Sequence, residues 1–176
     1  RMREILLELR ERKIFIAVGG AYASVDEKFF DGLCDVLFSG EADETWPKFV
    51  EQFAAGKPYE NLYKQAQPTD MSTLPTPRFD LLKVKRYATG SIQFSRGCPY
   101  QCSFCTIINV QGRKSRHRSP DDVERLVRLN WAQGIHKFFI TDDNFARNRA
   151  WEAIFDRLIE LREKDGIPIG LLIQVD

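Results

Sequence analysis

Three cysteines stand close together in the middle of a 176-residue chain. Cys98, Cys102 and Cys105 are separated by three and then two residues, and the fourth cysteine of the chain is Cys34. Such clustering is typical of metal or redox chemistry in a reducing compartment. Three thiolates can bind three irons of a 4Fe–4S cluster and leave the fourth iron open, whereas electron-transfer clusters normally use a fourth cysteine. An open iron can bind a substrate or a cofactor.

A structural zinc site is the alternative interpretation of these cysteines. Zinc in that role needs four ligands in a closed set. The remaining candidates are Cys34, far upstream, and His117 in a basic loop. The ligand count therefore favours an iron–sulfur cluster, and Cys34, which lies beside an apolar run, is predicted to be a buried small side chain.

The cysteine motif also carries a family resemblance. Cys98-x3-Cys102-x2-Cys105, with Phe104 directly before the last cysteine, resembles the signature of the radical S-adenosylmethionine (radical SAM) enzymes. The resemblance implies that S-adenosylmethionine binds the open iron, and that one electron from the cluster splits it into methionine and a 5′-deoxyadenosyl radical. It further implies a cofactor contact for Phe104, a small-molecule substrate, and an electron donor such as flavodoxin or ferredoxin.

Polar residues follow the next predicted strand, residues 137–141. In an α/β barrel the carboxyl ends of the strands face the active site. Radical SAM enzymes usually carry a Gly-Gly-Glu type segment here, which binds the amino group of S-adenosylmethionine. Asp142, Asp143 and Asn144 replace it, and their oxygens suit a cationic amine, so we expect them at the cofactor. Gln174, after the third predicted strand, is a weaker candidate by the same argument, and an Asx turn with a helix cap is the alternative role for the segment at 142–144.

The elements around these residues alternate between strand and helix. Strands are predicted at 91–95, 137–141 and 167–175. One helix should begin at Ser119-Pro120, where a capping hydroxyl precedes a first-position proline, and another should follow Trp151. Three strands alternating with two helices indicate an α/β barrel or an open sheet.

The first part of the chain shows the same alternation. Strands are predicted at 14–18 and 35–39, with short helices at 26–33 and 46–55. Gly19-Gly20 closes the first strand in a tight turn. Together with an amphipathic opening helix, this pattern is typical of half of a doubly wound α/β domain.

A second resemblance links the two parts. A βαβα half with glycines after its strands, followed by a proline-rich bridge and a radical SAM motif, is similar to the cobalamin-binding radical SAM proteins. That resemblance implies that Gly19 and Gly20 let the backbone approach the nucleotide tail of cobalamin. The family's Asp-x-His-x-x-Gly segment is absent from this sequence. A Rossmann-like domain that binds nothing is therefore the alternative.

The predicted organisation has three parts. Residues 1–60 are expected to be the C-terminal half of a Rossmann-like cobalamin-binding domain, 61–90 a proline-rich linker, and 91–176 the first half of a radical SAM partial (βα) barrel. Methylthiotransferases also place an α/β domain before the barrel, but theirs carries its own cysteine cluster. The resemblances imply a cobalamin-dependent enzyme that transfers a methyl group to carbon or performs a related radical reaction, and we expect this piece alone to be inactive.

The composition of the chain argues against nucleic acid and membrane as binding partners. The 26 basic residues balance 25 acidic ones, so no global charge favours nucleic acid. The basic segment at 112–118 is short and lacks interleaved aromatics, which favours a solvated loop. The chain has no apolar run long enough for a membrane span. With its reduced cysteines, the protein is expected to be cytoplasmic.

Overall fold

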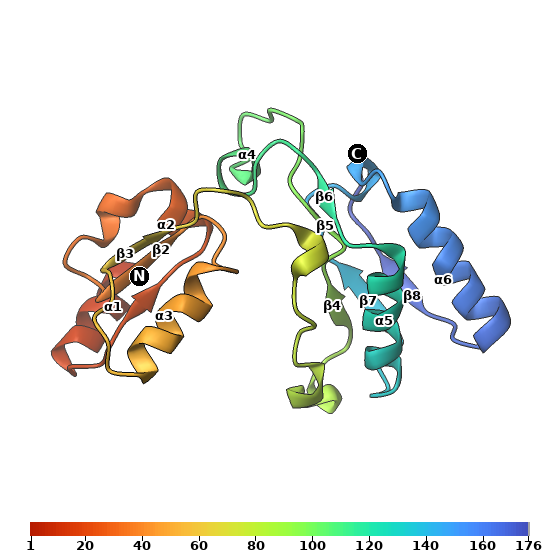
Figure 1. The fold of residues 1–176 in the computed structure, drawn as a ribbon, viewed down its shortest axis with the longest axis horizontal. Helices are drawn as coiled ribbons and strands as arrows, with labels where there is room; N and C mark the ends of the chain where they lie inside the picture. Colours follow the sequence, from red (N-terminus) through yellow and green to blue (C-terminus); the bar gives the residue numbers. More distant parts are fainter. Residues whose placement is uncertain (176) are drawn as a thin grey trace. The chain divides into compact units, whose positions relative to one another are not determined.

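The computed structural model describes residues 1–175 and shows an α/β chain in two compact units (Figure 1). The first unit contains residues 1–69 and 101–112, and the second contains residues 70–100 and the chain from 113 onward. Each unit is built on a three-stranded parallel sheet. The α/β class expected from the alternation of strands and helices is therefore confirmed.

The sheet of the first unit has the order β1-β2-β3. Its strands are β1 (Ala17–Val18), β2 (Val36–Ser39) and β3 (Leu62–Lys64). The central strand β2 is buried at Val36, Leu37 and Phe38. A continuous apolar run of this kind is typical of a parallel strand that is covered on both faces.

Short helices pack on this sheet. They are α1 (Met2–Glu11), α2 (Ala21–Val25), a 3-10 turn (Glu27–Phe30) and α3 (Thr45–Ala54), and α4 (Ile107–Val110) contacts α2. Because successive side chains of a strand point to opposite faces, Leu37 and Phe38 belong to different cores. One core holds Leu6, Ile16, Ala23, Phe30, Leu33 and Leu37, and the other holds Val36, Phe38, Phe49 and Tyr63.

The sheet of the second unit has the order β4-β7-β8. Its strands are β4 (Gly90–Ile92), β7 (Lys137–Ile140) and β8 (Gly170–Leu172), and the helices are α5 (Pro120–Trp131) and α6 (Trp151–Asp165). The predicted start of α5 is confirmed, since the Ser119 hydroxyl accepts from the N–H of Asp122 at 3.1 Å. The two helices and the sheet enclose one core, which includes Val123, Leu126, Phe138, Ile140, Ile154 and Leu161.

The structure corrects two expectations about the chain between these sheets. Strand β3 lies inside residues 61–90, which were predicted to form only a linker. Its three residues lie between prolines and are too few to show a period in the sequence. The strand predicted at 91–95 is divided, because the chain turns after Ile92 and Ser95–Arg96 form β5, which pairs antiparallel with β6 (Arg116–His117).

The helix predicted at 46–55 is found as α3, whereas several other predicted elements are shorter in the structure than in the sequence pattern. The strands expected at 14–18 and 167–175 retain only the residues of β1 and β8. The helix expected at 26–33 is the 3-10 turn, preceded by α2. None of the helices among residues 1–175 is long and apolar enough to cross a membrane.

Candidate functional site

The segment that leads to Cys98 is held by two acidic residues that follow β7. The N–H of Phe94 donates to Oδ1 of Asp142 at 2.7 Å, and the Ser95 hydroxyl donates to Oδ2 of the same carboxylate at 2.5 Å. The N–H of Gly97 donates to Oδ2 of Asp143 at 2.7 Å. The parallel pairing of β4 and β7 brings residues 142–144 beside the segment that leads to the cysteines.

Arg118 holds the same segment from another side. Its main-chain N–H donates to the carbonyl of Phe94 at 2.8 Å, and its Nε donates to the carbonyl of Gln93 at 3.2 Å. Its Nη1 donates to Oδ2 of Asp122 at 2.5 Å, and the residue is 5% exposed. The basic segment at 112–118 was predicted to be a solvated loop, and for Arg118 this was wrong, because the ion pair with Asp122 lets the guanidinium be buried.

The cysteine loop is divided between the two units. Cys98 follows β5 in the second unit, whereas Cys102 and Cys105 precede α4 in the first. The N–H of Cys105 donates to the carbonyl of Cys102 at 3.0 Å, which closes a tight turn. Cys98 and Cys105 are half-buried and Cys102 is exposed. Phe104 is 88% exposed.

The donor set fits an iron–sulfur cluster by its chemistry. Thiolates are soft ligands that select iron–sulfur clusters, zinc or copper(I). No group of three His, Cys, Asp or Glu side chains within residues 1–175 is arranged to hold a metal ion. Since metal ligands commonly take their final arrangement only as the metal binds, the loop's three thiols remain the residues able to hold such a cluster. Cys34, predicted to be buried, is half-buried against one core of the first unit, and this burial raises the pKa of its thiol above the ordinary value.

The residues after β7 and β8 meet in the second unit. The N–H of Phe145 donates to the carbonyl of Gln174 at 3.0 Å, so the structure brings the segment at 142–144 close to Gln174. Asp142 and Asn144 are buried, and Asp143 is half-buried. Burial raises the pKa of the Asp142 carboxyl, whereas the hydrogen bonds from Ser95 and Phe94 oppose this shift.

An aromatic contact that the sequence analysis did not identify lies beside this segment. The guanidinium of Arg147 lies over the ring of Tyr100, with 4.8 Å between the guanidinium carbon and the ring centroid. Tyr100 belongs to the cysteine loop, and Arg147 ends the 3-10 helix Phe145–Arg147. The signal in the sequence is the aromatic residue between Cys98 and Cys102, but its cationic partner is too distant in the chain to be found by spacing.

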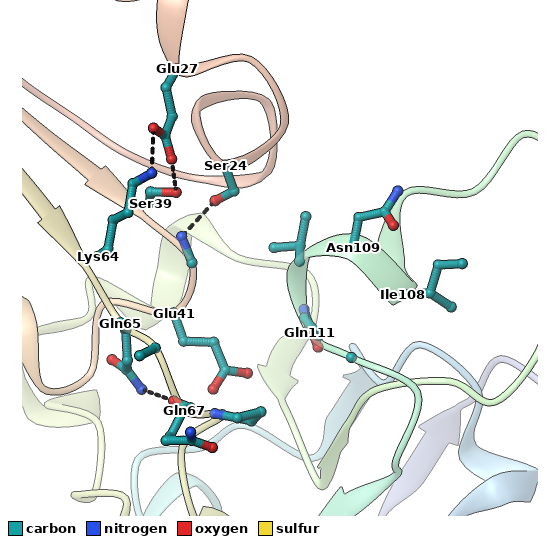
Figure 2. A pocket seen from close by; sticks show the side chains of 15 residues that line it. Ser24, Glu27, Ser39, Glu41, Lys64, Gln65, Gln67, Ile108, Asn109 and Gln111 are labelled. Atoms are coloured by element: carbon teal, nitrogen blue, oxygen red, sulfur yellow. Dashed lines mark hydrogen bonds and ion pairs between the residues drawn. The ribbon is translucent and has the colours of Figure 1, made fainter.

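The first unit contains a polar cavity of about 440 Å³ (Figure 2). Its walls include the ends of β2 and β3 and the chain from Ile108 to Gly112. Figure 2 shows Glu27 between two partners, the Ser39 hydroxyl at 2.7 Å and Nζ of Lys64 at 2.7 Å. Carboxyl ends of parallel strands are the usual place for ligands in open α/β sheets.

Gly19 and Gly20 are not among the residues that line this cavity. A Cβ on Gly19 would be 3.3 Å from Cβ of Phe38, so this glycine allows close packing on β2. Gly20 has φ +102° and ψ −175°, a conformation that is essentially restricted to glycine. Among the glycines, Gly40 and Gly112 are the ones that line the cavity. A Cβ on Gly40 would lie 3.2 Å from the carbonyl of Gln65.

Comparison with known proteins decides the family. Residues 92–174 match the radical SAM superfamily. The chain belongs to the radical SAM superfamily. An uncharacterized methyltransferase of Synechocystis is 39% identical over 153 residues, which cover 84% of this chain and 28% of that protein. Hopanoid C-2 methylase of Rhodopseudomonas palustris is 26% identical, over 97% of this chain and 33% of the methylase.

Solved structures of radical SAM enzymes share the fold. The radical S-adenosylmethionine methyltransferase TsrM of Kitasatospora setae, solved with cobalamin and a 4Fe–4S cluster, has a TM-score of 0.73 at 20% identity. The match covers 94% of this chain and 38% of TsrM. The cobalamin-dependent radical enzyme OxsB has a TM-score of 0.63 at 18% identity. This radical SAM chain thus spans between 28% and 38% of the length of the first three of these proteins.

Proposed function

We propose that the full-length protein is an enzyme that reductively cleaves S-adenosylmethionine at a 4Fe–4S cluster bound by Cys98, Cys102 and Cys105. The observation that carries this proposal is the three-cysteine motif within residues 92–174, the part of the chain that matches the radical SAM superfamily. When bound, the cluster supplies one electron and one open iron, and S-adenosylmethionine supplies the 5′-deoxyadenosyl radical.

The chain's own residues bind and orient these groups. Three thiolates leave one iron without a protein ligand, which is the place for the amino and carboxylate groups of the cofactor. We assign Asp143, Asn144 and Gln174 to the cofactor side because they follow neighbouring parallel strands at the same edge of the sheet. Phe104, exposed in the loop, is available to stack on the cofactor.

Cobalamin is the proposed second cofactor. The polar cavity at the ends of β2 and β3 supports this, since its hydroxyls, amides and ion pair offer hydrogen bonds to an amide-rich ligand. The likeness of fold to TsrM and OxsB and the methylase names of the relatives favour methyl transfer to a carbon atom of a small molecule. A radical SAM enzyme whose first unit is empty is the second candidate, favoured by the position of Gly19 and Gly20 outside the cavity lining.

The proposal includes a partner and a place. The electron must come from a reductant such as flavodoxin or ferredoxin, and a cytoplasmic location suits reduced thiols. The near balance of acidic and basic residues supports a small-molecule substrate rather than nucleic acid.

Product analysis of the full-length protein tests this function. After anaerobic reconstitution with iron and sulfide, reduction in the presence of S-adenosylmethionine should yield methionine and 5′-deoxyadenosine. Cys98→Ala, Cys102→Ala and Cys105→Ala should each abolish both products, whereas Cys34→Ala should retain them. Stoichiometric zinc without iron would instead identify a zinc-stabilised binding module.

A further inference from the structure

We infer that Asp142 is a positioning residue, which fixes the chain ahead of Cys98 and does not itself bind S-adenosylmethionine. This inference rests on the proposed function for its kinetic test and on the structure alone for its geometric test. It departs from the sequence interpretation, which placed Asp142 at the cofactor together with Asp143 and Asn144.

The first argument is the pairing of β4 and β7. Ile92 pairs with Ile140, and the N–H of Thr141 donates to the carbonyl of Ile92 at 3.0 Å. In the same register, Phe94 stands opposite Asp142. The chain turns toward β5 at this point, so the N–H of Phe94 bonds to the Asp142 carboxylate instead of a main-chain carbonyl. The side chain thus continues the ladder where the main chain departs from it.

The second argument is the occupancy of the carboxylate. Asp142 is 1% exposed, with one oxygen on the N–H of Phe94 and the other on the Ser95 hydroxyl. Each oxygen can accept a second hydrogen bond, but at 1% exposure a cofactor amine could reach one only by displacing the chain that covers Asp142. Such a displacement would leave the buried N–H of Phe94 without its acceptor, which is costly. The carboxylate is therefore satisfied by the chain that it holds.

The third argument is that Arg118 also holds the corner that the chain forms at residues 93–95. Arg118 is also buried: its main-chain N–H donates to the carbonyl of Phe94, and its guanidinium donates to the carbonyl of Gln93. The donors of the corner are therefore bonded to Asp142 and its acceptors to Arg118. Ser95 lies three positions before Cys98. Fixing the corner therefore restricts where the first cysteine can lie before any metal binds, which lowers the entropy lost when the cluster forms.

Three variants of the full-length protein separate positioning from cofactor binding. Asp142→Ala removes both acceptors. Asp142→Asn can still accept from the N–H of Phe94, and its amide can donate to the Ser95 oxygen, because a hydroxyl both donates and accepts. Ser95→Ala removes one bond at a residue with no role at the cofactor, and Ser91→Ala, exposed on β4, is the matched control.

Kinetics with S-adenosylmethionine give the first result. We expect Asp142→Ala to lower iron content and to reduce kcat for 5′-deoxyadenosine formation about 10- to 100-fold, the range for one or two lost charge-assisted hydrogen bonds, with KM for S-adenosylmethionine changed less than about threefold. Ser95→Ala should change kcat in the same direction, and Asp142→Asn should restore most of it. A rise of KM in Asp142→Asn, with Ser95→Ala equal to Ser91→Ala, would show direct cofactor binding and overturn the inference.

Amide hydrogen exchange on the cluster-free protein gives the second result, which is independent of the proposed function. The N–H groups of Phe94 and Gly97 should exchange about 10- to 100-fold faster in Asp142→Ala, and faster to a smaller degree in Ser95→Ala, than in Ser91→Ala. If Asp142→Ala does not fold, Ser95→Ala alone decides. Equal exchange in Ser95→Ala and Ser91→Ala would contradict positioning, whereas faster exchange in a protein that never binds iron would contradict only the proposed function.

Discussion

The hydroxyl of Ser24 joins two glycine turns of the first unit. It accepts from the N–H of Gly40 at 2.8 Å and donates to the carbonyl of Gly20 at 3.0 Å. Gly20 is the N-cap residue of α2 after β1, and Gly40 directly follows β2 with φ +85°. One side chain thus sets the distance between the two turns. Both Ser24 and Gly40 line the polar cavity.

Removal of this hydroxyl should reduce both the stability of the protein and ligand binding in the cavity. Ser24→Ala leaves the N–H of Gly40 without its acceptor, so we expect a loss of about 1 kcal/mol in the free energy of unfolding. Corrinoid binding by the full-length protein, followed by its visible absorbance, should fall about 5- to 10-fold, as 1 kcal/mol or slightly more implies. Ser91→Ala, on β4, should change neither quantity. Equal corrinoid affinity in Ser24→Ala and the parent would show that this cavity is not the cobalamin site.

Gly20 provides a test of the expected cobalamin contact. Gly20→Val should strain a backbone conformation that is essentially restricted to glycine, at a cost of about 1 to 3 kcal/mol. No atom lies within 4 Å of the added Cβ, so the branched side chain projects into open space where a ligand can approach. We therefore expect corrinoid binding to fall further than stability does.

Gly56→Val is the matched control for Gly20→Val. Gly56 has φ +62°, and its Cβ would also meet no atom within 4 Å, but it follows the end of α3, whereas Gly20 is bonded to Ser24 in the cavity wall. It should lose stability and keep its corrinoid affinity. If the two variants lose affinity equally, Gly20 acts through the fold and not through the ligand.

Asn144 tests the cofactor side of the second unit. It is buried between the end of β7 and the 3-10 helix Phe145–Arg147, whose first N–H bonds to the carbonyl of Gln174. Asn144→Ala should leave iron content unchanged and reduce 5′-deoxyadenosine formation about 10-fold, as expected for one lost polar contact of about 1.4 kcal/mol. Asn61→Ala, exposed before β3 and outside the cavity lining, is the control. Full activity in Asn144→Ala would mean that the segment at 142–144 forms a turn and does not contact the cofactor.

Glu124 makes the second unit sensitive to acid. Hydrogen bonds from Arg157 at 2.6 Å and from Arg128 at 2.7 Å lower the pKa of this carboxyl. A lowered pKa in the folded state gives stability that is present above the unfolded-state pKa, about 4.3, and is lost as the pH falls through the folded-state value. Glu124→Gln should therefore reduce the free energy of unfolding by about 0.5 to 1 kcal/mol at pH 7, after allowance for solvent screening.

The pH dependence is the part of this prediction that identifies the ion pair. The difference between Glu124→Gln and the parent should shrink below about pH 4 in urea titrations and should fall with added salt. Glu163→Gln, exposed near the end of α6, should show little difference at any pH. A difference for Glu124→Gln that persists at pH 3 would indicate lost packing instead.

Local features of the sequence predicted much of the fold and the position of the three cysteines in one loop. Ser119 and Pro120 begin α5 as expected, because a cap depends on residues that are adjacent in the chain. The three cysteines are likewise contained in one loop. Strand β3 was missed because a strand of three residues leaves no readable period, and its pairing with β2 depends on residues far away in the sequence.

Long-range contacts explain what the sequence could not predict at the site. The bonds from Asp142 to Phe94 and Ser95 cross 48 and 47 positions, and an acidic pair after a strand has the same pattern whether it binds a ligand or the chain itself. The buried ion pair of Arg118 was similarly hidden in a basic segment. Only the fold distinguishes a charge that is satisfied internally from one that is presented to solvent.

Electron paramagnetic resonance of the reduced, reconstituted full-length protein tests the central claim most directly. The account predicts one 4Fe–4S cluster whose signal changes when S-adenosylmethionine is added, because the cofactor binds the iron that Cys98, Cys102 and Cys105 leave open. Replacement of any one of these cysteines by Ala should remove the signal, and Cys34→Ala should retain both the signal and its response. A cluster signal that S-adenosylmethionine does not alter, or the same loss from Cys34→Ala, would contradict the account.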